Sequence, residues 1–270
     1  MPDESLPKEK QDLENKVVLV TGASRGIGKA MALAFAERNC RLVMMARNSE
    51  RLAQAVEDVR DSGASVLAIA LDVCHEEEIG KALERVRKEF GAVEILINNA
   101  GVYKTSPVAG HPTETWQEII NTNLTSAFFF CREVVQPMID SGWGRVINIS
   151  SISGKHAEIH GAAYSASKFG MIGLTQSLAL ETASKGVTVN ALCPGWVDTD
   201  MARSQLSDPE WCKLNSIDIQ ESLEIARLSI PQMRFVQPEE VAALALYLCS
   251  PAAQGITGQA INICGGMCLS

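Results

Sequence analysis

The sequence of 270 residues predicts an α/β protein, in which helices cover both faces of a seven-stranded parallel sheet. Short runs rich in Val, Ile and Leu alternate with longer amphipathic segments along the whole chain. The apolar runs are continuous rather than alternating, which is typical of strands that are buried on both faces. A glycine-rich turn follows the first apolar run. We therefore expect one domain without a linker or an internal repeat.

Seven segments are expected as strands, namely 17–21, 41–46, 65–70, 94–99, 145–150, 187–192 and 260–264. Amphipathic helices are expected between them. Two of these helices, over 49–63 and 76–91, end on a glycine, as helices often do. Residues 1–15 are polar and highly charged, so we expect a flexible N-terminal arm there and a folded domain over 16–270.

Composition excludes several functional classes. The net charge of −8 argues against broad nucleic-acid binding, which needs a basic face. The longest apolar run, 241–249, is too short to cross a bilayer, and the first residues do not form a secretory signal. We expect a cytoplasmic protein without nucleic-acid or membrane partners. Its eight cysteines lack a CxxC pair and should stay reduced; a metal or redox role for Cys264 and Cys268 is not favoured.

The stretch "TGASRGIG" at 21–28 predicts a phosphate-binding turn between a strand and a helix. Glycines let the backbone approach a pyrophosphate closely, and the free amides at a helix start favour its charge. The spacing differs from the G-x-G-x-x-G of many dinucleotide sites, so a simple tight loop is the alternative.

The stretch "YSASK" at 164–168 places a phenol and an ammonium one helical turn apart on one face. An ammonium near a phenol favours the phenolate, so Lys168 is expected to lower the pKa of Tyr164. The sequence thus predicts a catalytic pair, with two idle surface groups as the alternative.

These two motifs, with "NNAG" at 98–101, "NISS" at 148–151 and "PGWVDTDM" at 194–201, resemble those of the short-chain dehydrogenases/reductases. The resemblance runs from about Lys16 to the C-terminus. It implies a single Rossmann-type, doubly wound domain and hydride transfer between a nicotinamide and a carbonyl group.

The resemblance assigns Tyr164 as the proton donor, Ser151 as the group that polarises the carbonyl and Lys168 as the ammonium that also holds the nicotinamide ribose. Asn123 would hold a water that relays protons. Ser150 competes with Ser151, but the spacing to Tyr164 favours Ser151. Ser151 and Tyr164 are also the expected substrate contacts.

The family pattern likewise implies the residues that contact the dinucleotide. They are Gly22, Ser24, Arg25, Gly26, Ile27, Gly28, Arg47, Asp72, Val73, Asn99, Ala100, Gly101, Tyr164, Lys168, Pro194, Gly195, Val197 and Thr199.

Charge near the second expected strand predicts NADP(H) as the cofactor. NAD sites of this fold usually place an acid at the end of that strand, where this chain has Ala46 followed by Arg47. Arg47 and Arg25 together suit a 2′-phosphate, which accepts charge-assisted hydrogen bonds. The alternative is that Arg47 is merely solvated.

The segment 201–236 is expected to form a substrate lid, although its apolar residues could simply cap the domain. His156, Glu158 and His160 suggest a metal site, but hydride transfer needs no metal and we predict none; their loop is expected to line the pocket instead. A homotetramer is expected through helices at 123–139 and 162–184, with core packing as the alternative for "FFF" at 128–130.

Several stretches are most similar to 3-oxoacyl-carrier-protein reductases and polyketide ketoreductases. They predict an NADPH-dependent reductase of β-ketoacyl or polyketide thioesters, with an acyl carrier protein as a partner to be considered. The alternatives are a secondary-alcohol or 3-hydroxybutyrate-type dehydrogenase acting on small free substrates, and a non-catalytic dinucleotide-binding scaffold.

Overall fold

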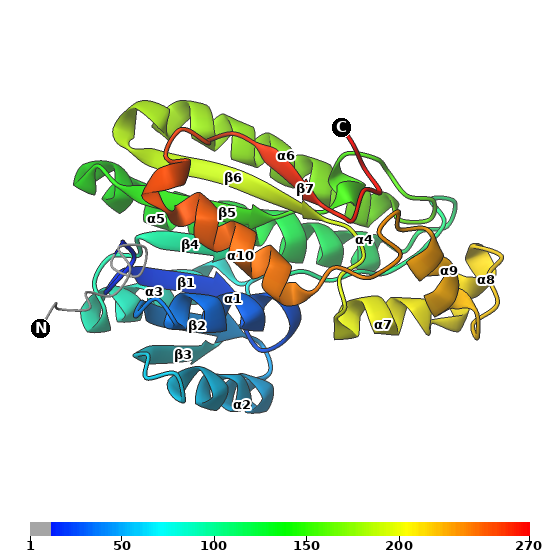
Figure 1. Cartoon of the computed structure of the whole chain (residues 1–270), viewed down its shortest axis with the longest axis horizontal. Helices are drawn as coiled ribbons and strands as arrows, with labels where there is room; N and C mark the ends of the chain where they lie inside the picture. The colour runs from blue at the N-terminus through cyan, green and yellow to red at the C-terminus, as the bar shows by residue number, and fades with distance from the viewer. Residues whose placement is uncertain (1–11) are drawn as a thin grey trace, which may run out of the picture.

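The structure, a computed structural model, describes residues 12–270. Its seven parallel strands form one sheet in the order β3-β2-β1-β4-β5-β6-β7 (Figure 1). All seven expected strands are confirmed, with ends displaced by two residues at most. The strands are β1 (Val17–Thr21), β2 (Arg41–Ala46), β3 (Val66–Ala70), β4 (Ile95–Asn98), β5 (Gly144–Ile149), β6 (Val187–Pro194) and β7 (Ala260–Ile263).

Helices cover both faces of the sheet, as the continuous apolar strands predicted. One face packs against α1 (Gly26–Ala36), α2 (Ser49–Arg60) and α10 (Pro238–Cys249). The other packs against α3 (Glu76–Glu89), α5 (Ser126–Ser141) and α6 (Ala162–Thr182). Phe35 and Phe130 are the largest fully buried side chains of the two layers. The remaining helical segments outside the cap are α4 (Thr113–Ile120), the π-helical turn Asn121–Thr125 and short turns at 152–154, 183–185 and 251–253.

The winding of the chain reverses next to β1. The chain builds outward from β1 through β2 to β3 and then crosses to the other side of β1 to form β4. Val18 of β1 accordingly pairs with Leu42 of β2 on one side and Ile95 of β4 on the other. The connections that leave β1 and β4 diverge to opposite faces, so a crevice opens at the carboxyl ends of these strands.

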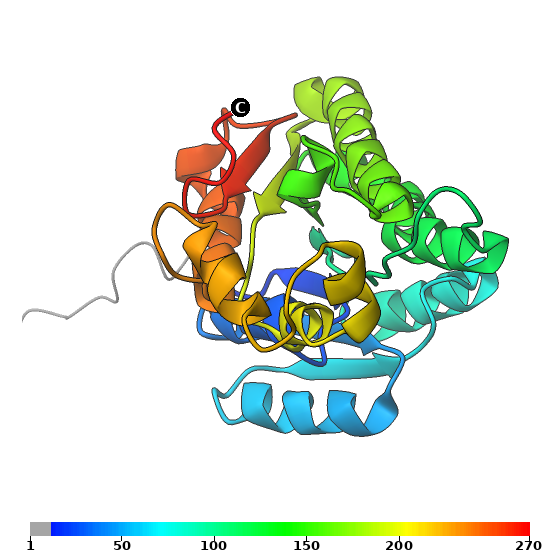
Figure 2. The ribbon, with the colours of Figure 1, turned by 90° about the vertical axis from the view of Figure 1, so that its right-hand side faces the viewer.

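Three short helices stand over this end of the sheet: α7 (Asp200–Leu206), α8 (Pro209–Leu214) and α9 (Ser222–Leu228) (Figure 2). They belong to residues 197–236, here called the cap segment, which a bridge between Val197 and Val236 closes at its base. Leu206, Trp211 and Ala226 form a small core of its own there. These helices occupy the region expected to form a lid.

The folded region begins earlier than expected. Leu13 is only 4% exposed, and the thiol of Cys40 donates to its carbonyl at 3.2 Å. The last residues of the expected flexible arm therefore pack against the domain, because an apolar side chain gains by entering the core beside β2. The rest of the arm, residues 1–11, lies outside the described residues. Within residues 12–270, no helix is long and apolar enough to cross a membrane.

Candidate active site

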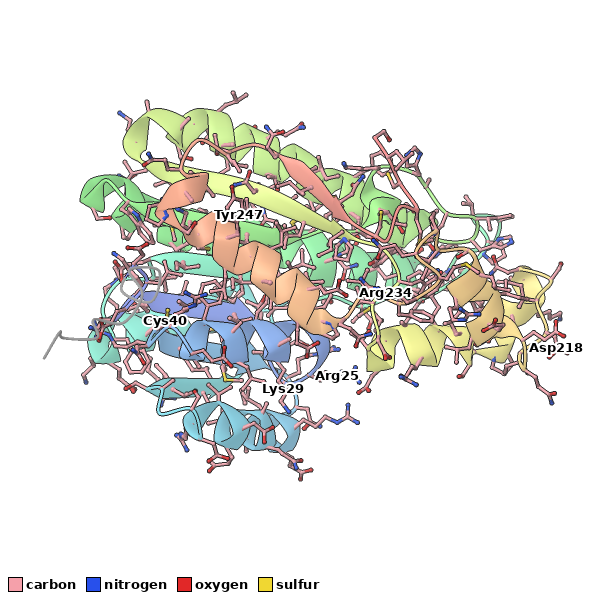
Figure 3. All side chains as sticks on the ribbon, viewed as in Figure 1. Arg25, Lys29, Cys40, Asp218, Arg234 and Tyr247 are labelled. Carbon is pink, nitrogen blue, oxygen red and sulfur yellow. The ribbon has the colours of Figure 1, made fainter. Side chains whose placement is uncertain are left out.

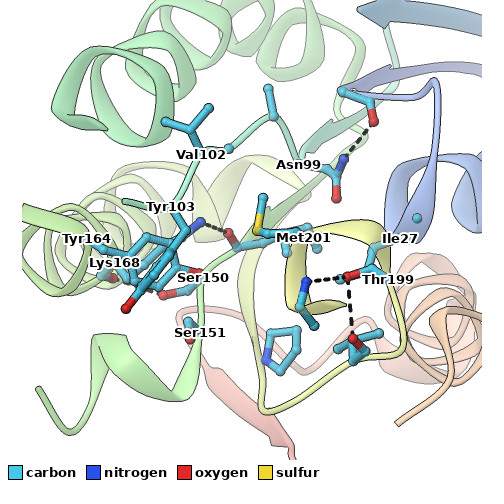
Figure 4. A pocket seen from close by; sticks show the side chains of 18 of the residues that line it. Ile27, Asn99, Val102, Tyr103, Ser150, Ser151, Tyr164, Lys168, Thr199 and Met201 are labelled. Carbon is cyan, nitrogen blue, oxygen red and sulfur yellow. Dashed lines mark hydrogen bonds between the residues drawn. The ribbon is translucent and has the colours of Figure 1, made fainter. Parts of the chain in front are cut away.

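A cavity of about 530 Å³ lies at the carboxyl ends of the central strands, beside α7 (Figure 4). Most residues of the predicted site line it. These are Gly22, Ser24, Arg25, Gly26, Ile27, Arg47, Val73, Asn99, Ala100, Gly101, Ser151, Tyr164, Lys168, Pro194, Gly195, Val197 and Thr199. Three further residues of the predicted site do not line the cavity but pack next to residues that do: Gly28, Asp72 and Asn123.

The predicted phosphate-binding turn is held against the end of β4. The hydroxyl of Thr21 accepts from the backbone N–H groups of Asn99 and Ala100, both at 3.0 Å. In return, the Asn99 amide donates to the carbonyls of Thr21 at 2.9 Å and Gly22 at 3.2 Å. Gly28 packs so tightly beneath the turn that a Cβ there would lie 2.4 Å from the Gly22 carbonyl oxygen. Gly28 therefore shapes the cavity without lining it.

Tyr164 and Lys168 face the cavity from successive turns of α6, as their spacing predicted (Figure 4). Lys168 is 4% exposed, and its ammonium donates to the Ile149 carbonyl at 2.8 Å. Its Nζ atom lies 5.5 Å from the centroid of the Tyr164 ring. Burial lowers the pKa of Lys168 to about 8, because a buried ammonium loses its hydration.

The pKa of Tyr164 was expected to be lowered by Lys168, but its net shift is upward. Burial raises the pKa of Tyr164, the Glu158 carboxylate adds to this rise, and the Ser151 hydroxyl partly opposes it. The physical reason is that the cavity removes the phenol from water, which penalises its anion more than the neighbouring groups stabilise it. Tyr164 consequently keeps its proton at neutral pH.

The two adjacent serines are distinguished by their contacts. The Ser150 hydroxyl donates to the Lys168 carbonyl at 2.9 Å, so it joins β5 to α6. The Ser151 hydroxyl lies beside Tyr164 and donates to the Ser153 hydroxyl at 3.1 Å. Both serines line the cavity, and Ser151 stays the predicted substrate contact because its hydroxyl is not bonded to the backbone of α6.

The Asn123 side chain is fully buried, and both its oxygen and its nitrogen form hydrogen bonds within the protein. It accepts from the Val102 N–H at 2.8 Å and donates to the Val102 carbonyl at 3.0 Å and to the Ser167 hydroxyl at 3.1 Å. Asn123 thus braces the segment after β4 against α6. The surrounding turn, Asn121–Thr125, is π-helical, a deviation that is frequent at functional sites.

Three arginines line the end of the cavity beyond β2. Arg25 lies 3.1 Å from the Asp200 carboxylate, at the start of α7 (Figure 3). Arg47 lies 3.8 Å from Asp72, whose other oxygen accepts from the Cys74 N–H, so Asp72 faces Arg47 rather than the cavity. The sequence did not point to the third arginine, Arg51, in the first turn of α2. Because the Arg25 and Arg47 pairs are exposed, they hold these guanidiniums only weakly.

The sequence motifs also did not indicate one aromatic residue that lines the cavity. Tyr103 packs edge-on against Tyr164, with ring centroids 5.0 Å apart, and no motif pointed to it. Glu158 and His156 line the cavity, as expected of the loop that precedes Tyr164. Residues 12–270 contain no group of three or more His, Cys, Asp or Glu side chains that could hold a metal ion. His156 instead lies 3.0 Å from the Ser270 hydroxyl, and the N–H of Cys268 donates to the Cys264 sulfur at 3.3 Å.

A family model described as short chain dehydrogenase matches residues 16–210. The chain belongs to this family. Its resemblance to short-chain dehydrogenases is thereby confirmed, and with it the oxidoreductase class.

Solved and curated relatives agree with this assignment. The chain is 41% identical over 257 residues to the 3-oxoacyl-[acyl-carrier-protein] reductase of Vibrio cholerae, covering 95% of this chain and 98% of that protein. It is 38% identical over 256 residues to the enzyme of the same name from Escherichia coli, again covering 95% and 98%. A crystal structure of a variant of actinorhodin polyketide ketoreductase with NADPH superposes with a TM-score of 0.90 at 36% identity, covering 97% of this chain and 99% of that one.

Glu158 generates a prediction about the pH dependence of folding stability. Burial raises the pKa of its carboxyl from 4.5 to about 7, partly opposed by the Ser153 hydroxyl. The unfolded chain ionises this group more readily, so stability is lost as pH rises through this window. We expect Glu158→Gln to stabilise the protein by about 1–3 kcal/mol above pH 7, and the difference to vanish below pH 4.5.

Urea unfolding at several pH values measures this difference. Glu240→Gln is a control that should change the free energy of unfolding in the opposite direction, because Arg234 lowers the pKa of Glu240 to about 2. That substitution should destabilise the protein above pH 4.5. A Glu158→Gln effect that does not change with pH would contradict the burial of an ionisable carboxyl at this position.

Proposed function

We propose that the chain is an NADPH-dependent ketoreductase that reduces the keto group of a β-ketoacyl or polyketide thioester. The observation that carries this proposal is the distribution of groups along one cavity. Ser151, Tyr164 and Lys168 gather at one end, and arginines line the other. The similarity to the carrier-protein reductases and to the NADPH-bound polyketide ketoreductase supports the choice of substrate and cofactor.

The cavity fits a dinucleotide phosphate along its length. Gly22 and Gly26 bring the backbone of the turn close to the cavity at the start of α1, where free amides favour a pyrophosphate. Arg25, Arg47 and Arg51 suit the extra phosphate of NADP(H). When bound, the nicotinamide supplies the hydride. Lys168 would hold the adjoining ribose through its ammonium donors.

The chain's own groups would manage the proton and the developing charge. Hydride addition makes the carbonyl oxygen negative, and the Ser151 hydroxyl can donate a hydrogen bond to that oxygen. Tyr164 then gives its proton to the same oxygen. Its raised pKa suits this direction, because the phenol stays protonated until it meets a more basic alkoxide. The buried Lys168 ammonium adds positive potential, and Asn123 would hold the relay water.

One observation favours a second candidate, a dehydrogenase that acts on small free hydroxy or keto compounds. The cap segment carries seven carboxylate and four cationic side chains, so it presents a net negative charge beside the cavity. An acidic carrier protein would be repelled by this surface. A free substrate or a short thioester would not.

The catalytic assignment is tested with Tyr164→Phe, which removes the proton donor and keeps the ring. We expect it to lose at least 90% of NADPH-dependent reduction, with NADPH affinity changed only a few-fold. The assay measures NADPH consumption with the same β-ketoacyl group on a carrier protein, on a short thioester and as a small free ketone.

Tyr247→Phe, at an exposed position on α10, is the matched control and should keep wild-type activity. Retention of activity in Tyr164→Phe would remove its proposed role. Reduction of the free ketone alone would replace the thioester reductase with the second candidate.

The cofactor assignment predicts that the wild type prefers NADPH to NADH by about 10–1000-fold in kcat/KM, because one or two charge-assisted phosphate contacts carry the preference. The double change Ala46→Asp with Arg47→Gln should reverse it, since the new carboxylate accepts from the ribose of NADH and repels a phosphate. Arg60→Gln removes an arginine of α2 outside the cavity and should leave the ratio alone. Equal use of both cofactors by the wild type would overturn the assignment.

We also propose that the protein is a homotetramer that uses α5 and α6. These helices expose Phe128, Phe169 and Leu180, which are 45%, 46% and 85% accessible in the single chain. Sedimentation should give about four times the chain mass of 29.1 kDa. Phe169→Glu should reduce that mass, whereas Leu228→Glu, equally exposed on α9, should not. A monomer at micromolar concentration would exclude this assembly.

A cytoplasmic location is part of the same proposal. All eight cysteines are free in the structure, and seven of them are buried. Unpaired thiols suit a reducing compartment, which is also where NADPH drives reductive biosynthesis. Fractionation of the source cells with an antibody against the protein would test it.

A further inference from the structure

Two polar atoms in the wall of the cavity are buried and lack a hydrogen-bond partner. They are the Tyr103 hydroxyl and the Glu158 Oε1 atom. Six side-chain atoms share this condition in the part of the chain that the structure describes, but only these two belong to residues that line the cavity. A buried polar group without a partner costs about 1–3 kcal/mol, so such groups are usually satisfied by a ligand or a water.

Both side chains lie at the substrate end, next to Tyr164. The Tyr103 ring packs edge-on against the Tyr164 ring, with centroids 5.0 Å apart (Figure 4). Burial raises the pKa of both tyrosines, and the Glu158 carboxylate adds to this rise. The Thr105 and Trp211 side chains partly oppose it at Tyr103, although neither lies within hydrogen-bond distance of the Tyr103 hydroxyl. A molecule whose carbonyl meets Tyr164 would therefore bring its neighbouring atoms to Tyr103 and Glu158.

The two residues stand on loops that are fastened to each other. The Ser106 N–H and the Thr105 hydroxyl donate to the His160 carbonyl at 2.8 and 3.2 Å. Gly161 leaves room for the Glu158 side chain, because a Cβ at Gly161 would lie 2.4 Å from Glu158 Cγ. The Glu158 N–H also donates to the Ser165 hydroxyl on α6 at 3.3 Å. The carboxyl is thus held inside the wall by its loop and by α6.

We propose that Tyr103 and Glu158 form a hydroxyl-binding subsite beside Tyr164, so that the preferred substrates are ketones with a hydroxyl group close to the reacting carbonyl. A substrate hydroxyl accepts from Tyr103 and donates to Glu158, whichever protonation state the carboxyl has. A plain alkyl group would leave both atoms unpaired. A substrate ammonium in place of the hydroxyl is excluded, because the nearby Lys168 ammonium in the same cavity would repel it. The inference rests on the proposed ketoreductase function and specifies its substrate.

The test compares two matched substrate pairs. One pair is the acetoacetyl thioester of N-acetylcysteamine and its γ-hydroxy derivative; the other is acetone and hydroxyacetone. We expect the wild type to favour the hydroxylated member of each pair it turns over by about 10–100-fold in kcat/KM, because the unhydroxylated member leaves buried polar groups unpaired. A ratio near one in the wild type would overturn the subsite.

Tyr103→Phe and Glu158→Leu should each reduce this preference to about threefold or less. The double variant should lose little more than either single one, because both groups bind the same hydroxyl. Ile159→Ala, next to Glu158 but 67% exposed, is the control and should retain the wild-type ratio. A purely structural role would change the rates for both members equally and leave the ratio intact, which would also overturn the proposal. Thermal unfolding verifies that each variant is folded.

The same experiment distinguishes a failure of the subsite proposal from a failure of the proposed thioester reduction. Turnover of the free ketone pair without the thioester pair would reject thioester reduction, while the ratio within the free pair would still decide the subsite. If neither pair is turned over, calorimetric titration of NADP⁺-loaded protein with the same four compounds supplies the ratio as dissociation constants. Equal constants within each pair would exclude hydroxyl recognition.

Discussion

The reversal of chain winding between β1 and β4 is the constraint on which the rest of this structure depends. Parallel strands must be joined by crossovers, and here the crossovers from β1 and β4 run to opposite faces of the sheet. Their divergence opens a crevice at the carboxyl ends of the central strands, beneath the helices of the cap segment. The cavity forms at that point, and residues that are 139 positions apart, Arg25 and Tyr164, line it together.

Close approach of backbone segments turns this opening into a shaped site. The Asn99 amide joins the end of β4 to the carbonyls of Thr21 and Gly22, and Gly28 lets α1 pack directly beneath them. The glycine turn is therefore held by the neighbouring strand rather than by its own sequence. Its N–H groups remain at the start of α1, where a phosphate would be stabilised.

Burial then sets the acid–base character of the substrate end. Lys168, Tyr164 and Glu158 share one poorly hydrated region, and the pKa of each shifts toward the neutral form. In the proposed reaction the Tyr164 phenol stays protonated until a more basic alkoxide accepts its proton, whereas the Glu158 carboxyl has one oxygen, Oε1, free to accept a hydrogen bond. The same loss of water thus prepares a proton donor and, on the adjoining loop, a group that can discriminate between substrates.

Local patterns in the sequence determined the strands, the glycine turn and the pairing of Tyr164 with Lys168. Each of these depends on residues close in the chain, through continuous apolarity, backbone freedom or the helical repeat. Tertiary structure alone decided the rest. Leu13 is buried in the core, and the Asn123 side chain is bonded to the backbone of Val102. The pKa of Tyr164 is raised, although it was expected to be lowered. The loop of Glu158 was expected in the cavity wall, but Tyr103 lies beside it only because two loops distant in the sequence pair next to α6. Burial and contacts between remote segments set these properties, and no local pattern encodes them.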